Sequence, residues 1–215
     1  MNAWSIELHG ITAHFRDNRF NTGGIDIPLR TFRCPPPSTL FGLLCAAKGG
    51  WIEPATLKLG WKMSFTGISK DFQRCKIPEG YIIRTGFQNV KDSPVVREFL
   101  SFPVLSILAI EGVSPEWFQA PVNPLALGRA EDLVTGYNIS QAQVEMVTSG
   151  NIENQFLPAG IGYGALCSAP LYFDEKRIPY KNQLLVEAND NQTIQSEKLM
   201  KNPSTGETFF LWNYE

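Results

Sequence analysis

Residues 32–50 read FRCPPPSTLFGLLCAAKGG, and this stretch decides the fold because it predicts the principal helix of the chain. The apolar residues of 40–47 cover most of a helical circumference, which is typical of a helix buried on nearly every side. Gly49 and Gly50 follow, and glycine readily takes the left-handed conformation that ends many helices. We therefore expect a buried helix that ends at this glycine pair.

The start of this helix is unusual because three prolines and two hydroxyl residues introduce it. Pro37 is tolerated where a helix needs no backbone donor, and Ser38 or Thr39 can cap the backbone. A helix start also leaves N–H groups unpaired and carries about half a positive charge, so it can bind a phosphate. Both interpretations stay open, a plain helix cap and a phosphate site.

Alternation of apolar and polar residues predicts strands on both sides of the helix. Residues 3–13 place Trp4, Ile6 and Leu8 on one side, which is the period of a half-buried strand. A loop with three arginines follows at 16–31. Further strands are expected at 60–69, 97–112, 137–148, 165–173 and 208–213, with Pro103 indicating an edge or a bulge and a helical turn within 121–134.

The order of these elements predicts an α+β fold. Strand, helix, strand, basic insertion, strand, helical turn and strand fit a ferredoxin-like (RRM-like) domain. We assign this domain to residues 1–148, with a projecting basic β-hairpin inserted at 66–97. The remaining residues, 149–215, are expected to form a smaller β-rich C-terminal lobe packed on it.

Charge is distributed unevenly along the chain. Residues 8–97 hold 13 Lys and Arg against 6 Asp and Glu, a net of +7, whereas residues 98–153 hold 1 against 7, a net of -6. Clustered cations attract polyanions because they release the counterions condensed on phosphates. The pattern indicates a nucleic-acid-binding first half, unless these are ordinary solvated charges that cancel in the fold.

Composition disfavours several other classes of function. No apolar run approaches the roughly 20 residues of a membrane span, and the N-terminus lacks a signal-peptide pattern, so we expect a cytoplasmic protein. The four cysteines are too scattered for a zinc site or a disulfide framework, and we expect no metal and no cofactor. His9 and His14 accompany no hydrolase or nucleotide-binding motif and are interpreted as structural. The glycines of 160–164 precede a strand and indicate a tight turn.

Arginines alternate with aromatic residues around the helix start. Guanidinium groups bind phosphates in a bidentate manner, and unpaired bases stack on rings, so the mixture suits single-stranded RNA. Each ring can equally be a loop anchor in the core. The residues concerned are Arg16, Arg19, Phe20, Arg30, Phe32 and Arg33.

With these elements in place, the chain resembles the fifth CRISPR-associated protein family, a branch of the RAMP superfamily found in type I Cascade complexes. The motifs that carry the resemblance occur in the family's order and extend over about 120 residues. They are AHFR (13–16), PPPSTLFGLL (35–44), REFL (97–100) and PLALGRAEDL (124–133).

The resemblance implies a non-catalytic subunit that binds the 5′ handle of the CRISPR RNA. It also implies that the subunit caps the backbone filament of Cascade, between the backbone RAMP subunit and the large subunit that reads the protospacer-adjacent motif in target DNA. The basic insertion would be the family's thumb. The expected RNA-binding residues are Arg16, Arg19, Arg30, Arg33, Ser38, Thr39 and Arg129, with Lys70, Arg74, Lys76 and Arg84 on the thumb.

Other interpretations stay open at this point. One subgroup of the family cleaves precursor RNA with a tyrosine, a lysine and a histidine, but this sequence has no Lys-His pair. Arg129 and Glu131 can contact RNA, orient a loop or form a buried structural pair. The acidic stretch 98–153 can face a basic neighbour. A generic ferredoxin-like enzyme or small-ligand protein is the third alternative.

Overall fold

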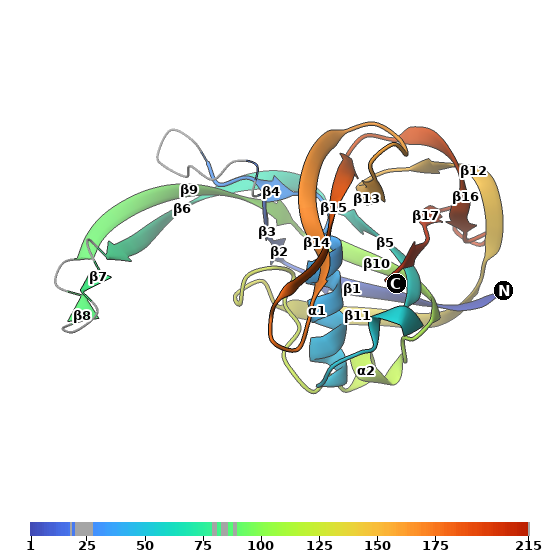
Figure 1. Cartoon of the computed structure of the whole chain (residues 1–215), viewed down its shortest axis with the longest axis horizontal. Helices are drawn as coiled ribbons and strands as arrows, with labels where there is room; N and C mark the ends of the chain where they lie inside the picture. Colours follow the sequence, from blue (N-terminus) through green and yellow to red (C-terminus); the bar gives the residue numbers. More distant parts are fainter. Residues whose placement is uncertain (18, 20–27, 79–80, 83–85, 88–89, 215) are drawn as a thin grey trace.

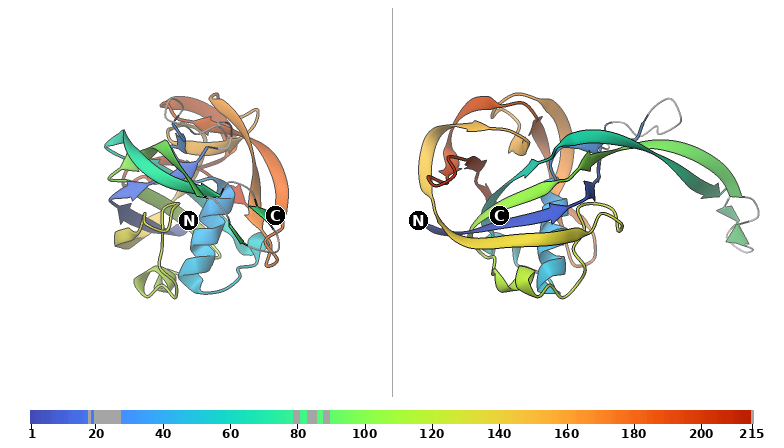
Figure 2. Two further views of the ribbon diagram at one scale, coloured as in Figure 1. Left: turned by 90° about the vertical axis from the view of Figure 1, so that its left-hand side faces the viewer. Right: turned by 180° about the vertical axis from the view of Figure 1, so that it is seen from behind.

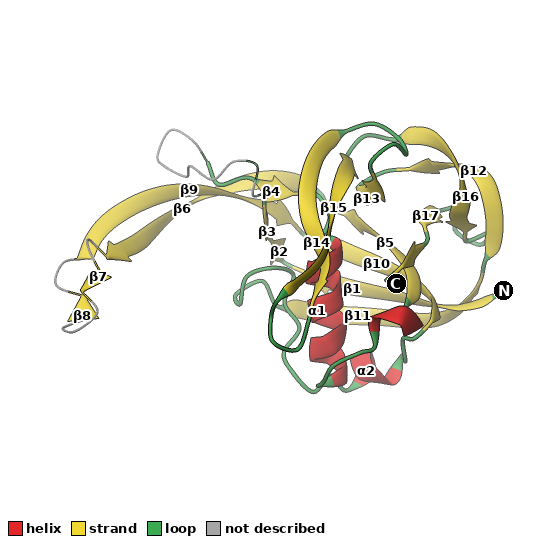
Figure 3. Ribbon diagram, viewed as in Figure 1, coloured by secondary structure: helices red, strands yellow, loops and turns green. Residues whose placement is uncertain are grey.

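The computed structural model shows a mixed α/β protein that consists mostly of strands with few helices (Figure 1, Figure 3). It describes residues 1–17, 19, 28–78, 81–82, 86–87 and 90–214, with the side chains of 74–93 left aside. Within these residues, no helix is long and apolar enough to cross a membrane, and no group of three or more His, Cys, Asp or Glu is placed to hold a metal ion.

One antiparallel sheet of five strands is built mainly from the first two thirds of the chain. In space its strands follow the order β11-β1-β10-β5-β18, so the strand at 2–10 lies between two strands that come much later in sequence. The predicted strand at 3–13 is confirmed as the first of them. The bounds are β1 (Asn2–Gly10), β5 (Lys58–Ser64), β10 (Val104–Glu111), β11 (Val134–Gln143) and β18 (Trp212–Asn213).

The predicted helix is confirmed as α1 (Pro37–Lys48), which lies across one face of this sheet (Figure 1). Leu40 and Leu44 on its inner side are 0% exposed. Gly49 ends the helix with φ 80° and donates its N–H to the carbonyl of Cys45 at 2.9 Å. A Cβ at this position would lie 2.5 Å from the side chain of Val122, so glycine is required both for its conformation and for its size.

The C-terminal third adds two three-stranded sheets. One has the order β12-β16-β17 and the other the order β13-β15-β14, with β14 packed against α1. The loop before β14 contains Gly160, Gly162 and Gly164, all with positive φ, which agrees with the predicted turn. The bounds are β12 (Glu145–Ile152), β13 (Gln155–Pro158), β14 (Ala165–Phe173), β15 (Pro179–Ala188), β16 (Gln192–Lys201) and β17 (Thr208–Phe210).

A long two-stranded hairpin projects from this body (Figure 1; Figure 2, right). It consists of β6 (Gly67–Pro78) and β9 (Val90–Ser101), with β7 (Tyr81–Ile82) and β8 (Gly86–Phe87) near its tip. At its base, β2 (Thr12–Ala13) extends the pairing, and beside it β3 (Phe15–Arg16) pairs with β4 (Thr31–Phe32). The base of the hairpin is therefore tied to the segment that joins β1 to α1.

Several predicted boundaries are wrong in detail. The strand expected over 97–112 is two strands, because Phe102 has φ 49° and Pro103 offers no backbone donor, so the ladder stops between β9 and β10. The strand expected over 60–69 likewise stops at Ser64, and the hairpin strand begins at Gly67. The helical turn expected within 121–134 is not found; short helical segments lie instead at α2 (Glu116–Gln119) and η1 (Pro54–Thr56).

Two further predicted strands are each divided between sheets. Residues 137–148 belong to β11 and β12, which meet at the buried Val144. Residues 208–213 belong to β17 and β18, and β18 returns to the first sheet beside β5. In both places the chain turns from one sheet into another without a loop, so the residue pattern carries no boundary signal.

Candidate nucleic-acid interface

A cleft of about 420 Å³ opens where the hairpin base meets the β3–β4 segment and the end of β15. We call it the hairpin-base cleft. It brings together four of the cations that the sequence singled out. The residues that line it are Asp17, Arg19, Arg30, Thr31, Arg33, Ile68, Lys70, Glu98, Glu187 and Asn189.

Backbone hydrogen bonds hold the floor of this cleft. Leu29 donates its N–H to the carbonyl of Val96 at 2.8 Å and accepts from the N–H of Glu98 at 2.9 Å, so the returning loop adds to the edge of β9. The N–H of Asp17 donates to the carbonyl of Arg30 at 3.0 Å. Arg30 is thereby fixed between the hairpin base and the outgoing loop, and its side chain is exposed.

Arg19 joins two buried carboxylates. One of its terminal nitrogens lies 2.6 Å from Asp17 and 2.7 Å from Glu187, and both acids are only 2% exposed. Burial alone would lower the pKa of this guanidinium, but hydrogen bonds with Asp17 and Glu187 outweigh burial and raise it above the usual range. The guanidinium also lies 5.0 Å from the ring centre of Phe32. Arg19 therefore ties the loop to the C-terminal lobe.

Glu187 organises a second arginine through the backbone. One of its carboxylate oxygens accepts the N–H of Arg33 at 2.7 Å. This bond uses only the backbone N–H of Arg33, and among the described residues its side chain forms no ion pair. Glu187 thus positions Arg33 without neutralising it by direct contact.

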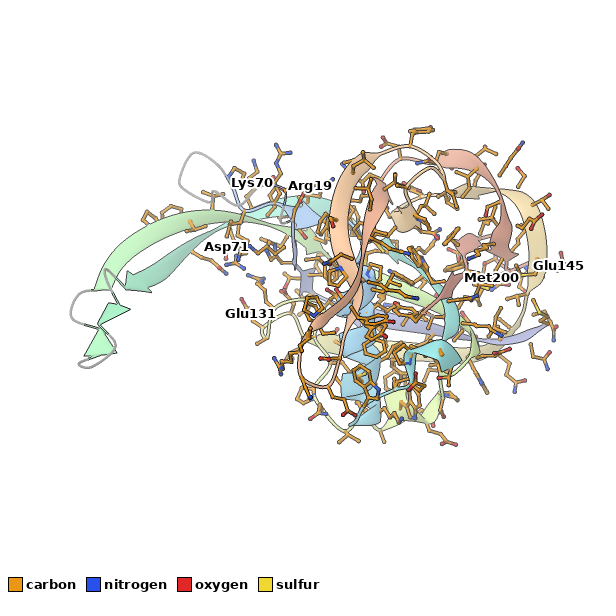
Figure 4. All side chains as sticks on the ribbon, in the orientation of Figure 1. Arg19, Lys70, Asp71, Glu131, Glu145 and Met200 are labelled. Carbon is orange, nitrogen blue, oxygen red and sulfur yellow. The ribbon has the colours of Figure 1, made fainter. Side chains whose placement is uncertain are left out.

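Lys70 supplies a cation from the hairpin. It lies opposite Glu98 in the β6–β9 register, and within the described part of the chain its ammonium group has no carboxylate partner within 4 Å. Figure 4 shows Lys70 and Arg19 together at the hairpin base, with Asp71 on the opposite side of the strand. Asp17 and Glu187 are both paired with Arg19, and Glu98 is the third acidic residue of the cleft lining.

Asn189 is a cleft residue that sequence reasoning missed. It follows β15, more than 150 residues after the arginines, and its side-chain Oδ1 is buried with no hydrogen-bond partner among the described residues. A buried polar atom without a partner is uncommon, and here it borders a cavity that can admit a ligand. The polar run NDN at 189–191 resembles an ordinary turn, so the sequence offers no signal for this role.

The start of α1 differs from the phosphate site that the prolines suggested. Its N-cap residue is Pro36, and neither hydroxyl caps the backbone. The carbonyl of Pro36 accepts the N–H groups of Thr39 and Leu40, at 2.9 and 3.1 Å. Ser38 lines a different cavity, of about 530 Å³, beside Phe41, Trp51, Asp174, Glu175 and Arg177. The structure therefore does not bring Ser38 and Thr39 into the hairpin-base cleft.

The prolines are held from the core side. The indole Nε1 of Trp61 donates to the carbonyl of Pro35 at 2.9 Å, and the hydroxyl of Tyr214 donates to the carbonyl of Pro37 at 3.1 Å. Both aromatic side chains are 1% exposed. These contacts fix the start of the helix against β5 and the C-terminal segment, so the prolines have a structural role.

Arg129 forms a structural ion pair, but its buried partner is Asp132 rather than Glu131, whose side chain is 58% exposed. Its guanidinium lies 2.7 Å from Asp132, which is 1% exposed, and 3.1 Å from Glu131. The hydrogen bond with Asp132 raises the pKa of Arg129, and the hydroxyl of Thr12 also donates to Asp132, at 2.6 Å. The preceding Gly128 has φ 115°, and this group does not line the cleft.

The remaining predicted residues lie outside the cleft or outside the described residues. Arg16 is exposed on β3 and does not line the cavity. The backbones of Arg74 and Lys76 pair with Pro94 and Asp92 along the hairpin. Arg84 lies outside the described residues.

Comparisons with known proteins identify the fold. No protein-family model matches the chain, and no curated protein matches it at a significant level. Among solved structures, a chain of a CRISPR RNA-guided surveillance complex matches with a TM-score of 0.55 and 16% identity over 90% of each chain. A CRISPR protein from Archaeoglobus fulgidus matches with a TM-score of 0.50 and 12% identity, over 99% of this chain and 100% of its own. The chain therefore has a fold found in CRISPR proteins.

This shared fold extends over almost the whole chain. Because the match reaches 90% or more of both partners, it includes the C-terminal third, which the sequence motifs did not reach. At such low identity the likeness concerns the fold alone.

Proposed function

We propose that this chain is the non-catalytic CRISPR RNA-binding subunit of a type I Cascade complex and binds the 5′ handle of the RNA in the hairpin-base cleft. The observation that carries the proposal is the convergence of Arg19, Arg30, Arg33 and Lys70 on one cleft at the base of a projecting hairpin. Single-stranded RNA suits such a site because its phosphates can contact cations while its bases remain free to stack.

The strand order supports the ferredoxin-like, RAMP-type part of the proposal. Numbered along the chain, β1, β5, β10 and β11 have the spatial order 4-1-3-2, all antiparallel, with α1 connecting the first two. A ferredoxin-like domain would have this arrangement. In that scheme the hairpin of β6 and β9 is inserted between the second and third strands, where the thumb of the resembled family would fall.

Binding without cleavage is supported by the surroundings of the two histidines. His14 is 3% exposed, and its Nδ1 lies 2.7 Å from the carbonyl oxygen of Glu98. His9 lies on β1, 3.8 Å from Glu7. Neither histidine lines the hairpin-base cleft. A general acid or base must reach the reacting atoms, and these positions favour a binding role over ribonuclease activity.

The assembly part of the proposal follows the resemblance. The chain would be present once in a hetero-oligomer and cap the backbone RAMP filament beside the large subunit, near the protospacer-adjacent motif of the target DNA. The acidic stretch 98–153 would face a basic neighbour, since complementary charge favours correct docking. Cross-linking that leaves this stretch wholly exposed to solvent in the assembled complex would contradict that contact.

The RNA site can be tested with Arg33→Ala and Lys70→Ala. Alanine at 33 keeps the backbone N–H that Glu187 accepts, so the fold of the cleft is preserved. The ligand is a short single-stranded RNA with the 5′ sequence of the RNA that co-purifies with the complex. Each lost phosphate contact should lower affinity and flatten the log–log salt dependence by about 0.7.

Lys198→Ala is the matched control because this lysine is exposed on β16, away from the cleft. It should leave both affinity and salt slope unchanged. If Arg33→Ala and Lys70→Ala behave like this control, the cleft is not the RNA site.

The nuclease alternative needs its own experiment. The purified chain is incubated with a precursor RNA that contains the hairpin repeat, and the products are separated on a denaturing gel. The proposal expects intact RNA. Specific cleavage by the lone chain, lost in a His14→Ala or His9→Ala variant, would establish the alternative instead.

A further inference from the structure

An aromatic side chain stands exposed on the hairpin just beyond the cleft. Phe72 on β6 is 63% exposed, although burying a phenylalanine ring away from water is favourable. No other ring stacks on it within the described part of the chain.

Strand alternation places Phe72 on the face that borders the cleft. Side chains two apart on a strand point to the same side, so Ile68, Lys70 and Phe72 form one row. Ile68 and Lys70 line the hairpin-base cleft. Phe72 comes next along the row, about 7 Å beyond Lys70 at the usual rise of a strand.

The opposite strand leaves this ring uncovered. Antiparallel register pairs Phe72 with Val96 and Lys70 with Glu98. Val96 is smaller than the ring that it faces, so the ring stays 63% exposed. The result is an accessible apolar ring on the side of a cationic cleft.

We infer that Phe72 is a base-stacking residue for the RNA held in the hairpin-base cleft. The inference rests on the proposed function and adds a position that the charge pattern did not reveal. When phosphates contact Arg33 and Lys70, the adjacent nucleotide lies within reach of the Phe72 ring. Stacking on an aromatic ring accepts every base, because each base has a π face. Phe72 would thus hold one nucleotide in place whatever its identity.

A nucleobase is favoured over an apolar protein partner because of the charges around the ring. Lys70 on the same face and Arg33 across the cleft are cations without a described ion pair, and they attract phosphates. A wholly apolar contact would require that these charges be desolvated beside it. A base, by contrast, leaves its phosphate next to the cations.

The experiment measures RNA affinity for Phe72→Ala and Phe72→Trp. Alanine should weaken binding by between about fivefold and a hundredfold, which is the usual range for one stacked base, and tryptophan should preserve binding. The salt slope should stay unchanged in both variants, because no phosphate contact is removed. Tyr163→Ala is the matched control, since Tyr163 is 64% exposed on the loop before β14.

A series of RNAs with one abasic nucleotide at successive positions tests the stacking itself. At one position, removing the base should weaken binding to the unmodified chain as much as Phe72→Ala weakens binding of the intact RNA. Binding to the Phe72→Ala variant should not be weakened further by removing that same base. If, at every position, the loss of affinity from the missing base simply adds to the loss from Phe72→Ala, the inference is wrong.

The outcomes separate this inference from the proposed function. If Arg33→Ala and Lys70→Ala weaken RNA binding while Phe72→Ala does not, the inference is wrong and the RNA site stands. If Phe72→Ala keeps its RNA affinity but loses co-purification of the neighbouring subunits, the ring is a protein contact and the inference is again wrong. If the unmodified chain binds no RNA, both fail.

Discussion

At the scale of single residues, the strongest organising contact is the ion pair network of Asp17, Arg19 and Glu187. Two carboxylates that are 2% exposed share one guanidinium, and Glu187 also accepts a hydrogen bond from the backbone N–H of Arg33. Removing one member of such a buried network leaves charge uncompensated, which costs far more than the network gains over apolar packing. In the proposed RNA site, Arg19 would therefore act chiefly by positioning its neighbours.

We predict that Arg19→Ala lowers the free energy of unfolding by about 3–5 kcal/mol, because it leaves two buried carboxylates without their cation. Arg16→Ala is the control, since Arg16 is exposed on the adjacent strand and its loss should cost no more than about 0.5 kcal/mol. Urea unfolding followed by circular dichroism measures both. Equal stability of the two variants would mean that the network contributes nothing.

His14 offers a second residue-scale consequence. Burial lowers its pKa below the ordinary value, the hydrogen bond to the carbonyl of Glu98 opposes this, and Arg97 and Arg129 lower it further. The folded state therefore binds the imidazole proton less readily than the unfolded state does. The contribution to stability is complete above pH about 6.5 and is lost as the pH falls from there through the folded-state pKa.

We therefore predict that the unmodified chain loses more stability between pH about 7.5 and 5.5 than a His14→Gln variant does, because the glutamine amide does not titrate. The glutamine can still donate to the carbonyl of Glu98. Urea unfolding at a series of pH values gives the two curves. Parallel curves would show that His14 does not titrate differently on folding.

How far the residues of the site could be predicted follows from the same contacts. Arg30, Arg33 and Lys70 were recognisable because clustered cations stand out in a sequence. Glu187 and Asn189 were not, since a single carboxylate at the end of a late strand, or an amide just after it, looks like any surface residue. Their role depends on contacts across about 150 residues of chain, which no local pattern encodes.

At the scale of elements, α1 and the first strand were predictable because burial imposes a clear period on their residues. The hairpin was harder, because residues 67–73 of β6 are all at least partly exposed and show little alternation of apolar and polar residues. The ends of strands were least predictable where the chain passes from one sheet to the next at Phe102 and Val144. There the backbone bends without the Gly or Asn residues that usually indicate a turn.

The hairpin carries an element-scale prediction. Replacing residues 74–93 with a two-residue Asn-Gly turn removes 4 Lys and Arg and 2 Asp and Glu, but leaves the cleft residues on β6 and β9. We expect the same thermal stability within a few degrees, because the outer ends of β6 and β9 lie away from the body of the protein (Figure 2).

If the outer hairpin supports the RNA as proposed, the shortened chain should bind RNA more weakly and with a flatter salt dependence, because it has lost four cations. Fluorescence anisotropy at several salt concentrations measures both quantities. A shortened chain with full affinity would assign RNA binding to the cleft alone and exclude a role for the outer hairpin.

At the scale of the whole molecule, one apolar core joins the two parts that the sequence separated at residue 148. The same cluster contains Ile6 and Leu44 from the first part and Phe156, Leu185 and Phe210 from the second. β14 covers α1, and β18 completes the sheet beside β5. Local periodicity could indicate each element, but this mutual burial depends on how distant segments meet.

We therefore predict that a fragment of residues 1–148 does not fold on its own. It would leave apolar faces of α1 and β5 in water, and exposed apolar surface of this extent promotes aggregation. The fragment, its complement 149–215 and the intact chain can be compared by circular dichroism and urea unfolding. The intact chain should show one cooperative transition at the same midpoint by near- and far-ultraviolet signals.

Two separate transitions, or a stable fragment with a cooperative transition of its own, would show that the parts are independent domains. In that case the Arg19–Glu187 contact would join two domains across the cleft rather than lie within one folded body. A loss at Arg19 would then change RNA affinity without changing the midpoint of either transition. The stability of the Arg19→Ala variant and the folding of the fragment therefore both test whether the two parts form one folded body.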